Sequence, residues 1–296
     1  MHMNALAITP RSLLWALRLV MVLLAPTMAL GVGTATDARA TAAGAVGTAA
    51  WGVAIAALVL ALVVPSPVGL TMVRLVLPAV VPAAVLMLAF GGGAWGVCAL
   101  AVSVLGTSVA LSPEFAEACV QASAYGHERR LPLRAPAAVL LPMGLSWSVW
   151  CTVTLAAIVS LAAQQWLLAG LLLAACAALS WLLARRFHRF SRRWLVLVPA
   201  GIVVHDHLVL GETLMLQRPN VALARLAPAD TQAADFTGPS AGHVIELTVR
   251  EMVLALLAPT PAEPKGKALH VQSLLVAPSR PGRALHAIAE AKLPVS

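Results

Sequence analysis

The stretch WLLARRFHRFSRRW, from Trp181 to Trp194, separates two halves of the chain that differ in character. It holds five arginines and no acidic residue: Arg185, Arg186, Arg189, Arg192 and Arg193. Apolar runs long enough to cross a bilayer precede it, and short alternating segments broken by turn residues follow it. We therefore expect a membrane domain over 1–187 and a strand-rich domain over 188–296.

The composition is that of a membrane protein. The chain is 60% hydrophobic and 11% charged, with a mean hydropathy of +0.88, whereas about 25% of a soluble domain is charged. The formal net charge is +8, but the basic residues gather at the ends of apolar runs. This placement indicates contact with a membrane surface and its anionic headgroups, and no nucleic-acid partner is expected. The preference for Ala, Val and Arg over Ile and Lys is typical of a GC-rich bacterial genome.

Six apolar runs predict six membrane-spanning helices. They lie near 12–32, 42–64, 69–90, 94–111, 137–161 and 164–184. Most connections between them are very short, so neighbouring spans form antiparallel hairpins. The exception is the segment 112–136, which separates the fourth span from the fifth and is expected to be a cytoplasmic loop of the membrane domain.

The arginine distribution predicts the orientation. Arg129, Arg130 and Arg134 fall within the loop 112–136, and the five-arginine stretch follows the sixth span. An even number of spans separates the two regions, so both can be cytoplasmic. Counting back places the N-terminus on the same side, in agreement with Arg11. We expect a multi-pass protein of the bacterial inner membrane with both termini in the cytoplasm.

The first span also allows a second interpretation. Basic residues, an apolar core and the sequence Ala38-Arg39-Ala40 resemble a signal peptide with its cleavage site. Cleavage there would leave the orientation of every later span unchanged. Arg18 and Arg74, which lie inside apolar runs, are expected to extend toward the headgroups near the cytoplasmic ends of their spans.

Helix signals open the loop 112–136. Ser112 can cap a helix, Pro113 suits its first position and Glu114 favours its first turn. We expect a short helix that lies on the membrane surface or against the C-terminal domain.

The second half of the chain predicts strands and one terminal helix. Apolar alternation with Gly, Pro and Asp at the breaks predicts seven strands. They cover 194–198, 201–205, 212–217, 221–226, 243–249, 252–257 and 268–277. Ala284, Leu285, Ile288 and Ala289 then recur at helical spacing. The expected fold is a bundle of six transmembrane helices followed by a small all-β domain with a C-terminal helix.

This order of elements, over about 190–292, resembles the bacterial pleckstrin-homology-like (PH-like) domains. In that family a bent seven-stranded barrel is closed at one end by the last helix. The resemblance implies an interaction module. Lipid-binding members of the wider fold carry basic residues in the first hairpin, whereas the turn here is Pro199-Ala200-Gly201. The departure speaks against binding of a specific phosphoinositide.

Few residues suit catalysis or metal binding. The predicted spans contain hydroxyls but no Asp, Glu, His or Lys. The most distinctive stretch within them is Ser146 to Trp150, which indicates aromatic anchoring at the interface. His205 and His207 share one face of a strand and could hold a metal, but no third ligand is evident and Asp206 points away. We expect no catalytic residue, no cofactor and no metal.

Three functions fit these features. The first is a non-enzymatic scaffold or assembly factor that presents a cytoplasmic PH-like domain to another protein, with the five arginines at the membrane surface. The second is a transporter or a transporter subunit. The third is a membrane-embedded enzyme that modifies lipids, for which the available residues are Glu114, Glu117, His127 and Glu128.

Overall fold

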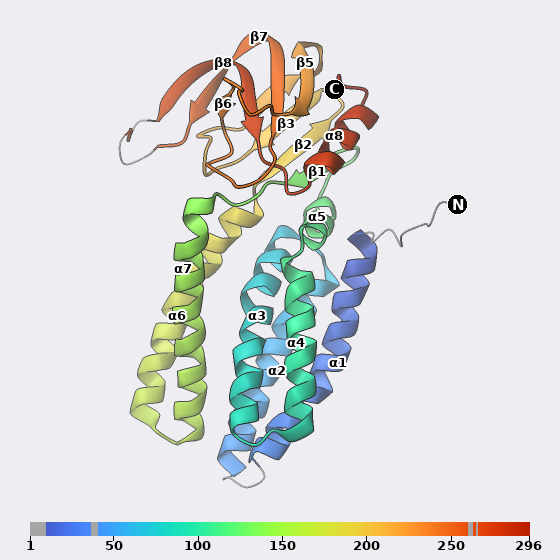
Figure 1. Cartoon of the computed structure of the whole chain (residues 1–296). Coiled ribbons are helices and arrows are strands. Elements are labelled where there is room, and N and C mark those ends of the chain that lie inside the picture. The colour runs from blue at the N-terminus through green and yellow to red at the C-terminus, as the bar shows by residue number, and fades with distance from the viewer. Residues whose placement is uncertain (1–9, 37–40, 260–262, 265) are drawn as a thin grey trace, which may run out of the picture. The chain divides into compact units, whose positions relative to one another are not determined.

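The computed structural model describes residues 10–36, 41–259, 263–264 and 266–296, and the chain divides into two compact units (Figure 1). The membrane unit comprises Met1–Cys119 and Gly144–Phe187. The β unit comprises Val120–Met143 and His188–Ser296. A segment from the middle of the chain therefore belongs to the same unit as the C-terminal part.

Six helices in the described part of the chain are long and apolar enough to cross a membrane. They are α1 (Pro10–Thr36), α2 (Thr41–Val63), α3 (Pro67–Ala89), α4 (Gly93–Leu111), α6 (Ala137–Ala162) and α7 (Trp166–Ser191). The prediction of six spans in a multi-pass membrane protein is confirmed. The last helix runs seven residues beyond the span predicted at 164–184, through Arg185, Arg186 and Arg189. The possible cleavage site at Ala38–Ala40 lies outside the described residues.

The first four spans form an antiparallel bundle (Figure 1). Helix α4 packs against both α1 and α3, and α2 packs against the same two helices. Gly106 shows how close the contact is, because a Cβ at this position would lie 2.7 Å from Val20 Cγ1 and 3.3 Å from a Leu77 methyl carbon. Small residues permit this approach in lipid, where helices associate by packing.

The two arginines inside the spans satisfy backbone groups of neighbouring helices. Arg74 on α3 donates from Nε to the carbonyl of Ala110 at 3.0 Å and from Nη2 to that of Ser112 at 3.2 Å, at the end of α4. Arg18 on α1 donates to the carbonyl of Leu62 at 3.1 Å, at the end of α2. The last carbonyls of a helix lack partners within the helix and carry partial negative charge. Each arginine therefore caps an adjacent span as well as lying near a helix end.

Helices α6 and α7 form a hairpin that tryptophan side chains join to α3. Trp150 Nε1 donates to Ser180 Oγ at 2.8 Å between α6 and α7, and Trp147 Nε1 donates to the Leu75 carbonyl of α3 at 3.0 Å. Trp150 is only 8% exposed and packs with Leu75 and Leu183. Interfacial anchoring is thus the wrong interpretation of Trp150, because this side chain fills the space between helices.

The short helix α5 (Pro113–Gln121) begins as expected, with the Ser112 hydroxyl accepting from the backbone N–H of Phe115 at 3.2 Å. Its apolar side chains Phe115 and Cys119 are buried. Burial raises the pKa of the Cys119 thiol to about 12, while Arg74 and the backbone of Ser66 oppose this rise. Up to Cys119 the helix belongs to the membrane unit, where it packs near the α2–α3 turn. The sequence predicted a position on the membrane surface or against the C-terminal domain, and it did not predict packing against the α2–α3 turn.

The β unit contains two four-stranded sheets and a helix. The first sheet has the order β1 (Arg129–Pro132), β2 (Trp194–Val198), β3 (Gly201–His205), β4 (Leu214–Gln217). The second has the order β5 (Val221–Leu226), β7 (Ile245–Leu257), β8 (Lys267–Val276), β6 (Ala234–Asp235), and a single turn of 3-10 helix, η1 (Arg218–Asn220), joins the two sheets. Neighbours pair antiparallel except β6 with β8. Helix α8 (Pro281–Glu290) follows.

The predicted fold class is confirmed, with three differences in the strands. The segments predicted at 243–249 and 252–257 form one strand, β7, whose pairing with β8 shifts register between Thr248 and Val253. Strands β1 and β6 were not predicted. Of these, β1 matters most, since it lies in the segment 112–136 that the sequence suggested was only a loop with a helix.

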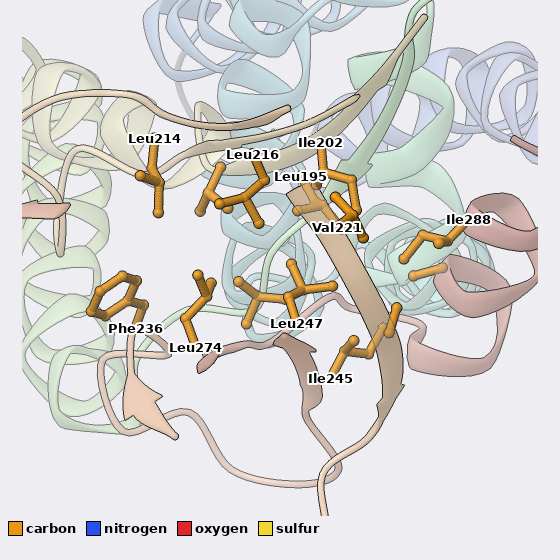
Figure 2. Close-up of a cluster of buried hydrophobic side chains, with 14 of the residues drawn as sticks. Leu195, Ile202, Leu214, Leu216, Val221, Phe236, Ile245, Leu247, Leu274 and Ile288 are labelled. Atoms are coloured by element: carbon orange, nitrogen blue, oxygen red, sulfur yellow. The ribbon is translucent and has the colours of Figure 1, made fainter. Parts of the chain in front are cut away.

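A hydrophobic core lies between the two sheets and α8 (Figure 2). The first sheet contributes Leu195, Ile202 and Leu216, and the second contributes Ile245, Leu247 and Leu274, all of which are essentially unexposed. Ile288 from α8 completes this set. Full burial of one such side chain stabilises a fold by about 1.5–3 kcal/mol, so this core is the main source of stability of the β unit.

Candidate functional site

The most unusual feature of the connectivity is that a membrane hairpin joins two neighbouring strands. Strand β1 pairs with β2 antiparallel, with Leu131 opposite Leu195 and Pro132 opposite Trp194. Between these two strands the chain leaves the sheet, forms α6 and α7, and returns. The β unit therefore has two direct chain connections to membrane-spanning helices, one entering α6 and one leaving α7.

Arg193 is a buried residue of the β unit, which corrects its prediction as a membrane-surface residue. Its guanidinium forms a two-pronged ion pair with Asp206, with Nε 2.8 Å from Oδ1 and Nη2 2.6 Å from Oδ2. Both side chains are only 1% exposed. Trp194 and His205 form the last pair of the β2–β3 hairpin. Arg193 precedes Trp194 and Asp206 follows His205, so the two residues lie opposite each other at the open end of the hairpin. Burial of the arginine is possible because the carboxylate neutralises it.

This ion pair holds together the two chain segments that lead to the membrane. Arg193 Nη1 donates to the carbonyl of Arg134 at 2.5 Å, just before α6 begins. In the other direction, the backbone N–H of Leu133 donates to the carbonyl of Arg193 at 3.0 Å. Asp206 also accepts from the backbone N–H of Leu208 at 3.0 Å. Loss of either ionic partner would leave the other charge buried without compensation.

The other four predicted membrane-surface arginines are exposed. Arg185, Arg186, Arg189 and Arg192 lie at the end of α7 and in the short link to β2. Arg185 places its guanidinium carbon 3.9 Å from the centre of the Trp181 ring. Within the described residues, none of the four forms an ion pair with an acidic side chain. Their charge remains available to an external anion.

His205 and His207 belong to an aromatic cluster on the first sheet. The rings of Trp194 and His205 stack with centroids 5.1 Å apart, and His207 meets His205 edge-on at 4.2 Å. Burial, followed by the nearby charges of His207 and Arg192, lowers the pKa of His205 to about 4. Within the described residues, no group of three or more His, Cys, Asp or Glu side chains is arranged to hold a metal.

The membrane unit contains an apolar cavity of about 650 Å³, lined by α1, α2, α3 and α6. Its floor is made of buried side chains, among them Met28, Trp51 and Met87. Its rim includes Val53, Phe90 and Val159, whose exposed fractions are 72%, 42% and 38%. The cavity is therefore closed toward the helices and open toward the lipid-facing surface.

The polar atoms in this lining are already engaged. The indole N–H of Trp51 donates to the carbonyl of Ala25 at 3.2 Å, and the hydroxyl of Thr154 donates to that of Trp150 at 2.7 Å. Thr36 donates to the carbonyl of Val32 at 2.8 Å. The lining within the described residues includes no Asp, Glu, His, Lys or Arg. The titratable side chain that remains in the lining is the thiol of Cys151.

The residues considered for lipid chemistry lie on α5 and just before β1. Glu114 and Glu117 lie on α5 in the membrane unit, and Glu117 is buried. His127 and Glu128 precede β1 in the β unit. A hydrogen bond from Arg130 holds the pKa of Glu128 below its ordinary value. Glu128 is therefore committed to an ion pair, at 2.8 Å from Arg130.

Comparison of the chain with models of known protein families, with curated proteins and with solved structures gives no match. A functional conclusion must therefore rest on the geometry of the two units.

Proposed function

We propose that the chain is a non-enzymatic scaffold or assembly factor of a bacterial inner membrane, and that its β unit receives a partner protein in the cytoplasm. The observation that carries this proposal is the insertion of the α6–α7 hairpin between the paired strands β1 and β2. The β unit is thus joined to membrane-spanning helices by two connections at adjacent strands instead of one.

The lengths of the two connections support this role. Four residues separate Pro132 from the first residue of α6, and two separate Ser191 from Trp194. A residue spans at most about 3.6 Å, so neither strand end can lie more than roughly 20 Å from its membrane helix. The Arg193–Asp206 pair binds both connections to the same site. A partner bound to this unit would thus be tethered to the membrane through two chain connections.

The proposed module is PH-like. Two sheets pack face to face, and the C-terminal helix places Ala284, Ala287 and Ile288 in their common core. Closure of the sheets by the last helix supports the family resemblance. The short parallel strand β6 and the strand β1, which comes from a distant part of the sequence, depart from a seven-stranded barrel.

We further propose that the exposed arginines Arg185, Arg186, Arg189 and Arg192 contact anionic headgroups on the cytoplasmic side. Arginines favour the cytoplasmic ends of membrane helices. Each basic side chain near an anionic leaflet contributes about 1 kcal/mol of attraction. Arg193 takes no part in this contact because Asp206 neutralises it.

The transporter and lipid-enzyme alternatives have less support. A transport path for a polar solute would need polar side chains across the bilayer, and the cavity between α1, α2, α3 and α6 is apolar. A lipid enzyme would need an available acid near a histidine, whereas Glu128 is committed to an ion pair with Arg130.

Site-specific photocross-linking in intact cells tests the scaffold proposal. Met252 and Leu254 are exposed apolar side chains of β7, at 64% and 52%, and a photoreactive residue at either should give a discrete adduct with another protein. Asp230, an exposed polar position of the same unit, is the matched control. Adducts with lipid alone, or no discrete adduct at any exposed position of the β unit, would contradict a partner-binding role.

A further inference from the structure

We propose that the cavity of the membrane unit binds one hydrocarbon chain of a bilayer lipid. The proposal goes beyond the scaffold role and does not depend on it. It rests on the chemistry of the lining, on the dimensions of the cavity and on where the cavity opens.

The chemistry of the lining selects a hydrocarbon. The cavity is formed by alanine, valine, leucine, methionine and aromatic side chains of four helices. The hydroxyl of Thr154 and the indole N–H of Trp51 bond to carbonyls of their own unit. A polar ligand group placed here would lose its hydration without gaining a hydrogen bond, which costs several kcal/mol. A methylene chain loses nothing on entry from the bilayer core.

The length of the cavity matches one leaflet. Its lining runs from Val76 to Phe90 on α3 and from Trp150 to Ala163 at the end of α6. At 1.5 Å per residue each of these segments is about 20 Å long. Half of the hydrocarbon core of a bilayer is about 15 Å thick. The cavity therefore extends from one membrane surface to the region of the midplane.

The width of the cavity suits a hydrocarbon chain. A volume of about 650 Å³ spread over about 20 Å gives a mean cross-section on the order of 30 Å². An extended hydrocarbon chain fits this space.

The opening of the cavity is continuous with the lipid-facing surface. Val53 on α2, Phe90 after α3 and Val159 on α6 belong both to the rim and to the exposed surface of membrane-spanning helices. The residues at its outer end, Thr36 and Ala163, lie at the ends of α1 and α6, and Ala163 is part of the α6–α7 turn. The chain would thus come from the leaflet that holds the α6–α7 turn. If the cavity were empty, the lining atoms would have no dispersion contacts on the side that faces it, so filling by a hydrocarbon chain is favourable.

Photolabelling with a phospholipid that carries a diazirine in its acyl chain tests the proposal. The full chain is reconstituted in vesicles of phosphatidylcholine and phosphatidylglycerol, irradiated, and mapped by peptide mass spectrometry. We expect label to concentrate on lining residues of α3 and α6. Ala54→Trp and Ala83→Trp each fill the cavity from a different helix and should reduce this label to the level of ordinary lipid-facing positions.

Ala174→Trp is the matched control, because Ala174 is an exposed residue of α7 that is not part of the lining. It should leave the label on α3 and α6 unchanged. Each variant is checked for an unchanged thermal midpoint, and two filling variants guard against a folding defect in one. Uniform labelling of all exposed helix faces, unaffected by either filling variant, would overturn the proposal. Labelling of the lining in vesicles but not in native membranes would also overturn it, in favour of a protein occupant.

Discussion

The two units provide partners for arginine side chains in different ways. In the β unit, Arg193 pairs with the carboxylate of Asp206, and both groups are removed from water. In the membrane unit, Arg74 and Arg18 donate to carbonyls at the ends of neighbouring helices. No Asp or Glu occurs in the predicted spans, so a carboxylate partner is not available there.

The difference follows from what stabilises each unit. The β unit has a large apolar core, and hydrophobic burial can support the desolvation of an ion pair that fixes the ends of two strands. In the bilayer the hydrophobic effect does not drive helix association, because lipid chains are as apolar as the side chains. Helices there associate through packing and hydrogen bonds. An arginine that caps an adjacent helix supplies such bonds and keeps its charge near the headgroups.

The largest effect should follow from breaking the buried pair. Arg193→Gln or Asp206→Asn leaves one uncompensated buried charge, which costs about 3–5 kcal/mol. We expect loss of protease resistance in the β unit of the full chain in detergent. Arg192→Gln is the control, because Arg192 is exposed and adjacent. Equal resistance of the Arg192 and Arg193 variants would contradict a structural role for the pair.

The double variant Arg193→Met/Asp206→Leu sharpens the same comparison. Apolar replacement of both partners removes the charge imbalance, and in buried ion pairs such a change is often neutral or stabilising. It should therefore recover much of the stability lost in the single variants. No recovery would mean that the hydrogen bond from Arg193 to the Arg134 carbonyl matters more than the charge.

A smaller effect is expected in the membrane unit. Arg74→Leu leaves the carbonyls of Ala110 and Ser112 without donors, at about 1–3 kcal/mol. Arg74→Lys keeps the charge and one or two hydrogen bonds, so its stability should lie between that of Arg74→Leu and that of the wild type. Thermal unfolding in nanodiscs gives the measurement. Wild-type stability of the Leu variant would show that Arg74 only extends to the headgroups.

The exposed arginines should affect membrane docking without affecting stability. Replacement of Arg189 and Arg192 by Gln removes about 1 kcal/mol of lipid attraction per residue and leaves α7 and β2 folded. The measurement is protease accessibility of the link 187–194 in anionic and neutral vesicles at low and high salt. Attraction should weaken as the Debye length falls to about 3 Å at 1 M salt. Equal accessibility in all conditions would reduce these arginines to determinants of topology.

The smallest effect concerns His205. Its folded pKa of about 4 lies below its ordinary value of 6.5, so the unfolded chain takes up the proton first. The contribution to stability is complete above pH 6.5 and is lost as the pH falls toward 4. Because the ring is only partly buried, solvent screening makes this contribution small. Hydrogen exchange of β2 and β3 peptides should show less acid sensitivity in His205→Gln, whereas His286→Gln, at an exposed position of α8, should match the wild type.

The six spans, the main strands of the β unit and α8 could be predicted because each is encoded by a local run or a local period. Strand β1 could not, since RRLP has two charges and a proline, and its partner β2 lies more than sixty residues away. The cavity could not be predicted either, because it depends on how α6 packs against the first three helices. Side-chain contacts between distant segments leave no periodic signal.

The burial of Arg193, by contrast, could have been predicted from the sequence. A tight turn at Pro199-Ala200 sets the register of the hairpin, and counting outward from it places Arg193 opposite Asp206. The surrounding arginines obscured this relation, because five like charges after an apolar helix resemble a uniform surface cluster. Register within a hairpin is thus a better guide than charge density to which arginine is buried.

Cysteine cross-linking across β1 and β2 tests most directly whether a membrane hairpin is inserted between paired strands. Arg130→Cys and Val196→Cys place two thiols opposite each other in the observed register, and Arg130→Cys with Val198→Cys is the out-of-register control. A protease site introduced at 163–165, in the α6–α7 turn, separates the two halves of the chain for detection. We expect mild oxidation to join the halves in the first pair and not in the control. Failure of the first pair to cross-link, or equal cross-linking in both, would contradict the pairing of β1 with β2 on which the fixed attachment of the β unit depends.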